Sequence, residues 1–118
     1  MTEATSSKNM MLGPGVIDTI ISITVSETDG VASIGSPVTN GIRAMFAAGP
    51  STSGIETSRD EEGNLEVALH ISVYYGFVLP DLAEKLREAI ANALMVQVGI
   101  PVSRVDIYID SIQFPAQG

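Results

Sequence analysis

The stretch LEVALHISVYYGFVLPDLAEKLREAIANALMVQVGIPVSRVDIYID, residues 65–110, decides the fold because strand and helix periodicities follow one another within it. Over 65–75 apolar and polar residues alternate, which predicts a long strand with two different faces. The face predicted to point into the core consists of Leu65, Val67, Leu69, Ile71, Val73 and Tyr75. The opposite, half-polar face consists of Glu66, Ala68, His70, Ser72 and Tyr74.

A helix is predicted directly after this strand. Pro80 suits the first helical turn, and Asp81 lies near the positive end of the helix dipole. Gly99 and Pro101 predict where the helix ends. Its apolar stripe consists of Leu79, Leu82, Ala83, Leu86, Ile90, Ala93, Leu94 and Val98.

A further strand is predicted over 102–110, where the alternation returns. The side chains predicted to face inward are Val105, Ile107 and Ile109. Those predicted to face outward are Arg104, Asp106, Tyr108 and Asp110. Before the long strand, a short strand over 54–58 and a turn over 60–64 complete a hairpin with it.

The first third of the chain gives a less regular pattern. A helix is expected from near Pro14 to the pair Asp29-Gly30, although the β-branched residues at 20–25 would also suit a strand. Residues that break regular structure are frequent over 36–54 and indicate loops around one short helix at 42–48.

Together these elements predict a single α+β domain of two layers. Its helices pack on a small mixed or antiparallel sheet made of the hairpin and a C-terminal strand. The domain is expected to span residues 13–113, between a disordered tail at 1–12 and a C-terminal tail at 114–118. A chain of 118 residues that is 45% hydrophobic has enough apolar material for one core.

Composition excludes several classes of function. The formal net charge is −8 and the 6 basic side chains are scattered along the chain, which argues against nucleic acid as a partner. The chain has 0 cysteines, which excludes disulfides and thiolate metal sites. Residues 1–9 lack the pattern of a signal peptide, and no apolar stretch reaches the roughly 18 residues of a membrane span. We therefore expect no direct membrane insertion.

Residues that could carry catalysis are few. His70 lies in the middle of a predicted strand, and no Gly-x-Ser-x-Gly motif accompanies it. Asp106 and Asp110 are separated by about 13 Å along one strand, which is too far to share a metal or a proton. The acidic turn at 60–62 lacks the ligand spacing of a calcium loop, and residues 13–15 lack a phosphate-binding motif. We predict no enzyme, metal ligand or cofactor.

One predicted surface has the composition of a binding site. Tyrosine, arginine and acidic side chains share the outward faces of two strands, as they do at many protein interfaces. The alternative is that the first helix covers this face and makes its residues a second packing layer. The candidate protein-interaction surface consists of His70, Tyr74, Arg104, Asp106, Tyr108 and Asp110.

The order of several motifs resembles the alkaline shock protein family, which comprises envelope stress response and general stress proteins of Gram-positive bacteria. The motifs are GVI at 15–17, ETDGV at 27–31, the strand at 67–73, YGFVLPD at 75–81 and VDIYI at 105–109. The resemblance covers about residues 13–112 and implies a cytoplasmic, non-enzymatic protein of cell envelope homeostasis. Some family members are held at the membrane by a separate anchor protein, and others are encoded near genes of fatty-acid metabolism. The family has no agreed catalytic residues, and this chain lacks the long charged C-terminal tail of many relatives.

Two functions follow as expectations. The first is a stress-associated scaffold at the inner face of the cell membrane, which self-associates or docks on an anchor protein through the candidate surface or an exposed edge strand. The alternative is a regulator of fatty-acid or lipid metabolism that binds an enzyme or a small apolar metabolite. Its pocket is expected beneath 36–54, lined by Ile42, Met45 and Phe46.

Overall fold

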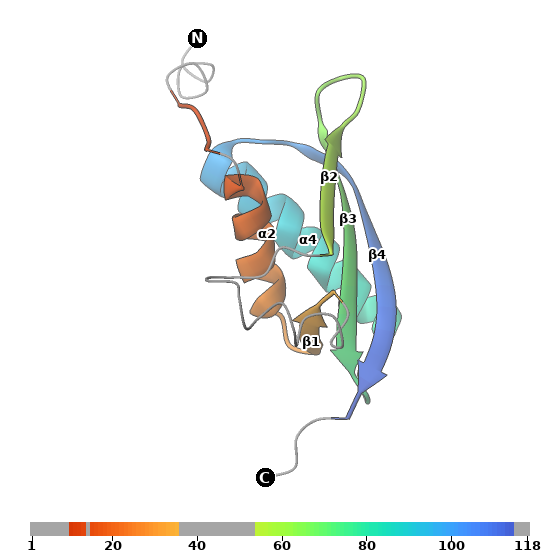
Figure 1. Cartoon of the computed structure of the whole chain (residues 1–118). Helices are drawn as coiled ribbons and strands as arrows, with labels where there is room; N and C mark the ends of the chain where they lie inside the picture. The colour runs from red at the N-terminus through yellow and green to blue at the C-terminus, as the bar shows by residue number, and fades with distance from the viewer. Residues whose placement is uncertain (1–9, 14, 36–53, 115–118) are drawn as a thin grey trace.

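The structure, a computed structural model, describes residues 10–13, 15–35 and 54–114. The described residues form the helices α2 (Val16–Ser26) and α4 (Leu79–Val98) and the strands β1 (Val31–Ile34), β2 (Ile55–Arg59), β3 (Leu65–Tyr74) and β4 (Val102–Gln113) (Figure 1). Residues 1–9 of the predicted tail, the short helix at 42–48 and the pocket lined by Ile42, Met45 and Phe46 lie outside these residues.

β3 is the central strand of a mixed sheet. Along one edge it pairs antiparallel with β2 over its first half and with β1 over its second half. Along the other edge it pairs in parallel with β4, from Leu65 beside Val102 to Tyr74 beside Gln113. A parallel pair needs a crossover connection, and α4 provides it. The predicted α+β class is therefore confirmed, with the mixed form of the sheet.

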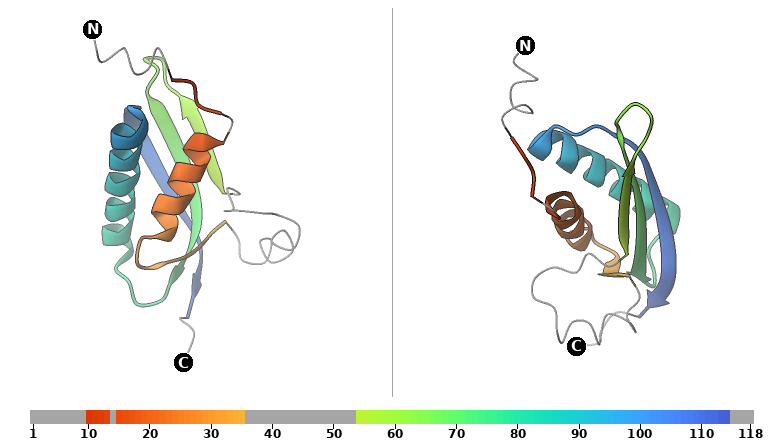
Figure 2. Two further views of the ribbon diagram at one scale, coloured as in Figure 1. Left: turned by 90° about the vertical axis from the view of Figure 1, so that its left-hand side faces the viewer. Right: turned by 45° about the horizontal axis from the view of Figure 1, so that its top comes forward.

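Both helices pack on the same face of this sheet, as Figure 1 and Figure 2 show. The side chains of β3 that alternate toward the helices are almost fully buried, as the alternation predicted. They contact the apolar stripe of α4 and the buried side of α2. The buried core consists of Ile21, Val25, Ile34, Ile55, Leu65, Val67, Leu69, Ile71, Val73, Leu82, Leu86, Ile90, Leu94 and Val105.

The ends of α4 match their sequence signals. A proline occupies the first turn of the helix, and Gly99 closes it with a positive φ of 72°. The amide of Gly99 donates to the carbonyl of Met95, which satisfies one of the last carbonyls of the helix.

One alternative is decided, and three details differ from the predictions. The run at 20–25 is helical, so its alternative interpretation as a strand is wrong. α2 ends at Ser26, before Asp29-Gly30, and the unpredicted strand β1 begins directly after that pair. Tyr75 was expected in the core but is 63% exposed, because β3 ends at Tyr74. β4 continues beyond the predicted end at Asp110, alongside the end of β3.

Candidate interaction surface

The candidate surface lies on the face of the sheet that the two helices leave uncovered. We call it the polar face. All six residues predicted for the surface alternate along β3 and β4 with the residues that face the core. Because α2 and α4 pack on the core side of the sheet, the alternative of a second packing layer under the first helix is wrong. Its members are Glu66, Ala68, His70, Ser72 and Tyr74 of β3 and Arg104, Asp106, Tyr108 and Asp110 of β4.

The parallel register sets which side chains of the polar face are neighbours. Glu66 lies beside Arg104, and His70 lies beside Tyr108. The rings of His70 and Tyr108 are stacked, with their centroids 4.6 Å apart and their planes inclined by 14°. The polar face therefore carries opposite charges at one end and an aromatic pair at its centre.

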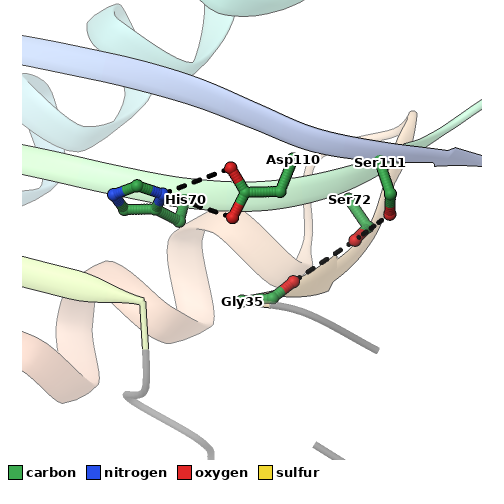
Figure 3. Close-up of polar contacts among 5 residues, drawn as sticks. All are labelled: Gly35, His70, Ser72, Asp110 and Ser111. Carbon is green, nitrogen blue, oxygen red and sulfur yellow. Dashed lines mark hydrogen bonds and ion pairs between the residues drawn. The ribbon is translucent and has the colours of Figure 1, made fainter. Parts of the chain in front are cut away.

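Asp110 joins this pair through an irregularity of β4. The register passes from Ile71 beside Ile109 to Ser72 beside Ser111, so Asp110 is an extra residue without a register partner in β3. Its carboxylate lies 3.2 Å from Nδ1 of His70, in position to accept a hydrogen bond when that nitrogen carries a proton (Figure 3). His70, Tyr108 and Asp110 thus form one contact group on the polar face.

A second polar group, next to the first, was missed by the sequence analysis. The hydroxyl of Ser72 donates to the carbonyl of Gly35 at 3.2 Å and shares a hydrogen bond of 2.7 Å with the hydroxyl of Ser111 (Figure 3). Ser72 is fully buried although it belongs to the polar face. Alternation placed Ser72 on this face, but Ser111 reaches it because of the irregularity at Asp110, for which the sequence carried no signal.

The other end of the polar face is charged and shallowly concave. Nε of Arg104 lies 3.0 Å from a carboxylate oxygen of Asp106, and both side chains are substantially exposed. A hollow of about 360 Å³ is lined by these two residues, by Glu56 and Ser58 of β2 and by Glu66 of β3. Among the lining residues the carboxylates outnumber the one guanidinium, so the hollow carries a net negative charge.

Tyr74 stands apart from the groups above. Its partner in the register is Gln113, at the end of the sheet where β3 and β4 finish. There it lines an apolar hollow of about 360 Å³ together with Phe77, Val78 and Ile112. Five of the six predicted residues therefore contact one another: His70 contacts Tyr108 and Asp110, and Arg104 contacts Asp106. Tyr74, the sixth, lies at the edge of the polar face.

The contact between His70 and Asp110 on the polar face invites comparison with a catalytic site. An aspartate that orients a histidine is also part of a hydrolytic triad, but that arrangement needs a hydroxyl on the other ring nitrogen. Ser72, two residues along β3 on the same face, directs its hydroxyl to Gly35 and Ser111. In the part of the chain that the structure describes, no three residues of the metal-ligating types cluster as a metal site would require.

The acidic turn at 60–64 has a structural role. Oδ1 of Asp60 accepts hydrogen bonds from the backbone amides of Glu62 and Asn64, each at 2.9 Å. Loss of hydration raises the pKa of the Asp60 carboxyl, but these bonds and those from the side chains of Ser103 and Asn64 outweigh it and hold the pKa below its usual value. The carboxylate closes the hairpin that aligns β2 with β3.

Neither helix of the described residues combines the length and the apolar character needed to cross a membrane.

Comparison with known proteins agrees with the motif order. Residues 2–114 match the model of the alkaline shock protein 23 family, whose description gives a cell envelope-related function. The uncharacterized protein YqhY of Bacillus subtilis (strain 168) is 26% identical over 112 residues, which cover 95% of this chain and 82% of the relative. No solved structure matches the chain.

Proposed function

Because the chain belongs to the alkaline shock protein family, whose function is related to the cell envelope, we propose that it is a non-enzymatic interaction module. Its polar face binds a protein partner, and in an envelope context that partner is a small membrane protein that holds the module at the inner face of the cell membrane. The module itself contributes recognition, and the anchor contributes the membrane attachment.

The observation that carries this proposal is the uncovered polar face. Both helices pack on the opposite side of the sheet, while Tyr108 remains 48% exposed in the middle of the polar face. Tyrosine and arginine are enriched at the centres of protein interfaces, and a tyrosine ring buries a large area at a small entropic cost. The stacking on His70 also fixes the ring of Tyr108 before any partner arrives.

A fractionation experiment tests the proposal. A tagged copy is expressed in the native host, membrane and cytosol are separated, and proteins that remain bound after a mild salt wash are identified by mass spectrometry. We expect recovery in the membrane fraction with one small membrane protein. The double variant Tyr74→Ala, Tyr108→Ala should shift to the cytosol and lose that partner.

The matched control is Tyr75→Ala, which also removes an exposed tyrosine ring. Tyr75 lies beyond β3 and packs against Phe114, at a ring-centroid distance of 5.2 Å, so it is not part of the polar face. This variant should fractionate as the wild type does. If the double variant keeps its partner, or if the control loses it equally, the polar face is not the binding surface.

The same experiment distinguishes the anchored module from the second hypothesis, a regulator of lipid metabolism. A cytosolic complex with an enzyme of lipid synthesis, unaffected by the double variant, would favour the regulator. Binding of a small apolar metabolite would also raise the midpoint of thermal unfolding, because a ligand that binds the folded state stabilises it.

A further inference from the structure

β4 is a long edge strand. Within the described residues it pairs with β3 alone, and it runs for 12 residues from Val102 to Gln113. Its second edge therefore presents a row of backbone groups without a strand partner. Proteins usually shorten, cover or charge such an edge, because it is a template for pairing with another chain.

The hydrogen bonds of β3 identify which residues of β4 present these groups. The amides of Leu65 and Tyr75 donate to carbonyls of Pro101 and Gln113, so odd-numbered residues of β3 bond toward β4. In a parallel pair the N–H and C=O of each such residue form hydrogen bonds with the two residues that flank its partner in the register. Ile107 is the partner of Leu69, so its neighbours make the bonds and its own N–H and C=O point away from β3.

The residues two positions before and two positions after Ile107 have the same orientation. Val105 is the partner of Val67, and Ile109 is the partner of Ile71. Three alternate residues thus direct both a donor and an acceptor to the outer edge. They lie between the two register irregularities of β4, where the strand is regular.

We infer that a second copy of this chain pairs antiparallel with the outer edge of β4, about a two-fold axis at Ile107. This inference goes beyond the proposed function, because it concerns the outer edge of β4, where the polar face contributes only Arg104 and Asp110. A residue before Ile107 in one copy then lies opposite the residue at the same distance after Ile107 in the other copy. Ile107 therefore lies opposite Ile107 of the second copy, and Val105 lies opposite its Ile109. The outward donors and acceptors of the regular segment are then paired.

Charge complementarity supports this register. With the axis at Ile107, Arg104 of each copy lies opposite Asp110 of the other, so two contacts of opposite charge form by symmetry. These positions are non-hydrogen-bonded pairs of an antiparallel ladder, which are the closer of its two kinds of pair.

The two neighbouring registers are less favourable. An axis at Ile109 places Arg104 opposite a residue beyond the end of β4 and removes both contacts of opposite charge. An axis at Val105 places Arg104 opposite Asp106 but shortens the ladder to residues 102–108. The axis at Ile107 keeps both charge contacts and extends the ladder over residues 102–112.

The helix side of the edge is apolar and also matches itself. Val105 is buried, while Ile107 and Ile109 are only partly buried and pack against the core from its margin. Ile112, 53% exposed, faces the Val102 end of the other copy. Pairing of two copies would join these side chains into one continuous apolar layer and complete their burial.

Two features oppose the pairing without preventing it. Nε of Arg87 donates to the carbonyl of Val105 at 3.3 Å, but a carbonyl oxygen can accept a second hydrogen bond. Each copy carries a formal net charge of −8. At physiological ionic strength charges separated by more than about 8 Å are largely screened, so the facing Arg104–Asp110 pairs decide the local electrostatics.

A charge-swap experiment on the full chain tests the inference by light scattering coupled to size exclusion. The wild type should have twice the 12.4 kDa mass of one chain. R104D and D110R each place like charges opposite one another at both symmetric contacts, and each alone should raise the dimer Kd by more than about tenfold. Mixed in equal amounts, the two variants restore both contacts of opposite charge and should form a heterodimer.

A backbone variant tests strand pairing independently of charge. Ile107→Pro removes an outward N–H that β3 does not use, so the monomer should keep its circular dichroism spectrum while the dimer is lost. Ile107 lies on the helix side of the sheet, so the polar face and its proposed binding to a membrane protein stay intact. A monomeric wild type, a mixture that stays monomeric, or a dimer that survives Ile107→Pro would overturn the inference.

Discussion

At the scale of single residues, Gly30 shows how one missing side chain joins two elements. Its φ is 103°, and a Cβ at this position would lie 3.0 Å from Cδ2 of Phe77. Its carbonyl accepts a hydrogen bond from the amide of Tyr74 at 2.8 Å. The glycine therefore allows the turn after α2 to pack directly against the ring that follows β3. This close approach explains why glycine suits the position better than any larger residue.

Replacing Gly30 with alanine should destabilise the protein by about 2–4 kcal/mol, since a positive φ and a steric clash act together. The control is Gly63→Ala in the hairpin turn, where φ is 87° but an added Cβ meets no atom within 4 Å. The control should lose only about 1–2 kcal/mol, because it suffers from the backbone conformation alone. Urea unfolding measures both. Equal losses would mean that the ring of Phe77 moves aside freely.

At the scale of elements, α4 links the two strands of the parallel pair and packs its apolar side against the sheet. Leu86 is fully buried in the middle of the helix, while Glu88 two residues later is exposed. The apolar stripe predicted from the sequence faces the core, because apolar residues at helical spacing over the whole helix leave a single way to orient it.

Leu86→Ala should lower the free energy of unfolding by about 2–5 kcal/mol, because it leaves a cavity between α4 and the sheet. Glu88→Ala, in the same helix but facing outward, should change it by no more than about 0.5 kcal/mol. Chemical denaturation followed by circular dichroism gives both values. A loss below about 1 kcal/mol for Leu86→Ala would show that the surrounding side chains collapse into the space.

The elements that could be predicted repeat a hydrophobic pattern over many residues. The features that could not be predicted depend on contacts between elements. β3 has 10 residues and α4 has 20, so each repeats its pattern several times. β1 has only 4 residues and exists because the turn at Gly30 delivers it to β3. Tyr75 continued the alternation, but the positive φ of Gly76, 106°, turns the chain away from the sheet.

The candidate surface was also predictable only in part: the sequence indicated its face but not all of its contacts. Alternation alone placed His70 and Tyr108 on one face, and the parallel register made them neighbours. The contact of His70 with Asp110, and that of Ser72 with Ser111, required an extra residue in β4. An irregularity of this kind arises from how two strands fit together, so the sequence of one strand does not reveal it.

At the scale of the whole molecule, β3 is the strand on which the rest of the sheet is assembled. It has strand neighbours along both edges and helices over its apolar face. β2, by contrast, is exposed at every residue after its first. The cooperative stability of the domain is therefore expected to be concentrated in β3 and in the buried side of α4.

Native-state hydrogen exchange should show this distribution directly. Amides of β3 from Val67 to Val73 should exchange most slowly, close to the rate set by global unfolding. Amides at the hairpin turn around Glu62 should exchange faster by at least about tenfold, because they open without unfolding the core. Equal protection of the turn and of β3 would mean that the whole sheet opens as one unit.

The placement of the tyrosines has an optical consequence. The chain has no tryptophan, and its three tyrosines, Tyr74, Tyr75 and Tyr108, lie on or directly after β3 and β4. The ultraviolet absorption and the fluorescence of tyrosine thus arise from rings in the sheet and at its end. Intrinsic fluorescence of the unlabelled protein would report on events at the sheet, including the arrival of a partner beside Tyr108, and would respond little to changes confined to the helices.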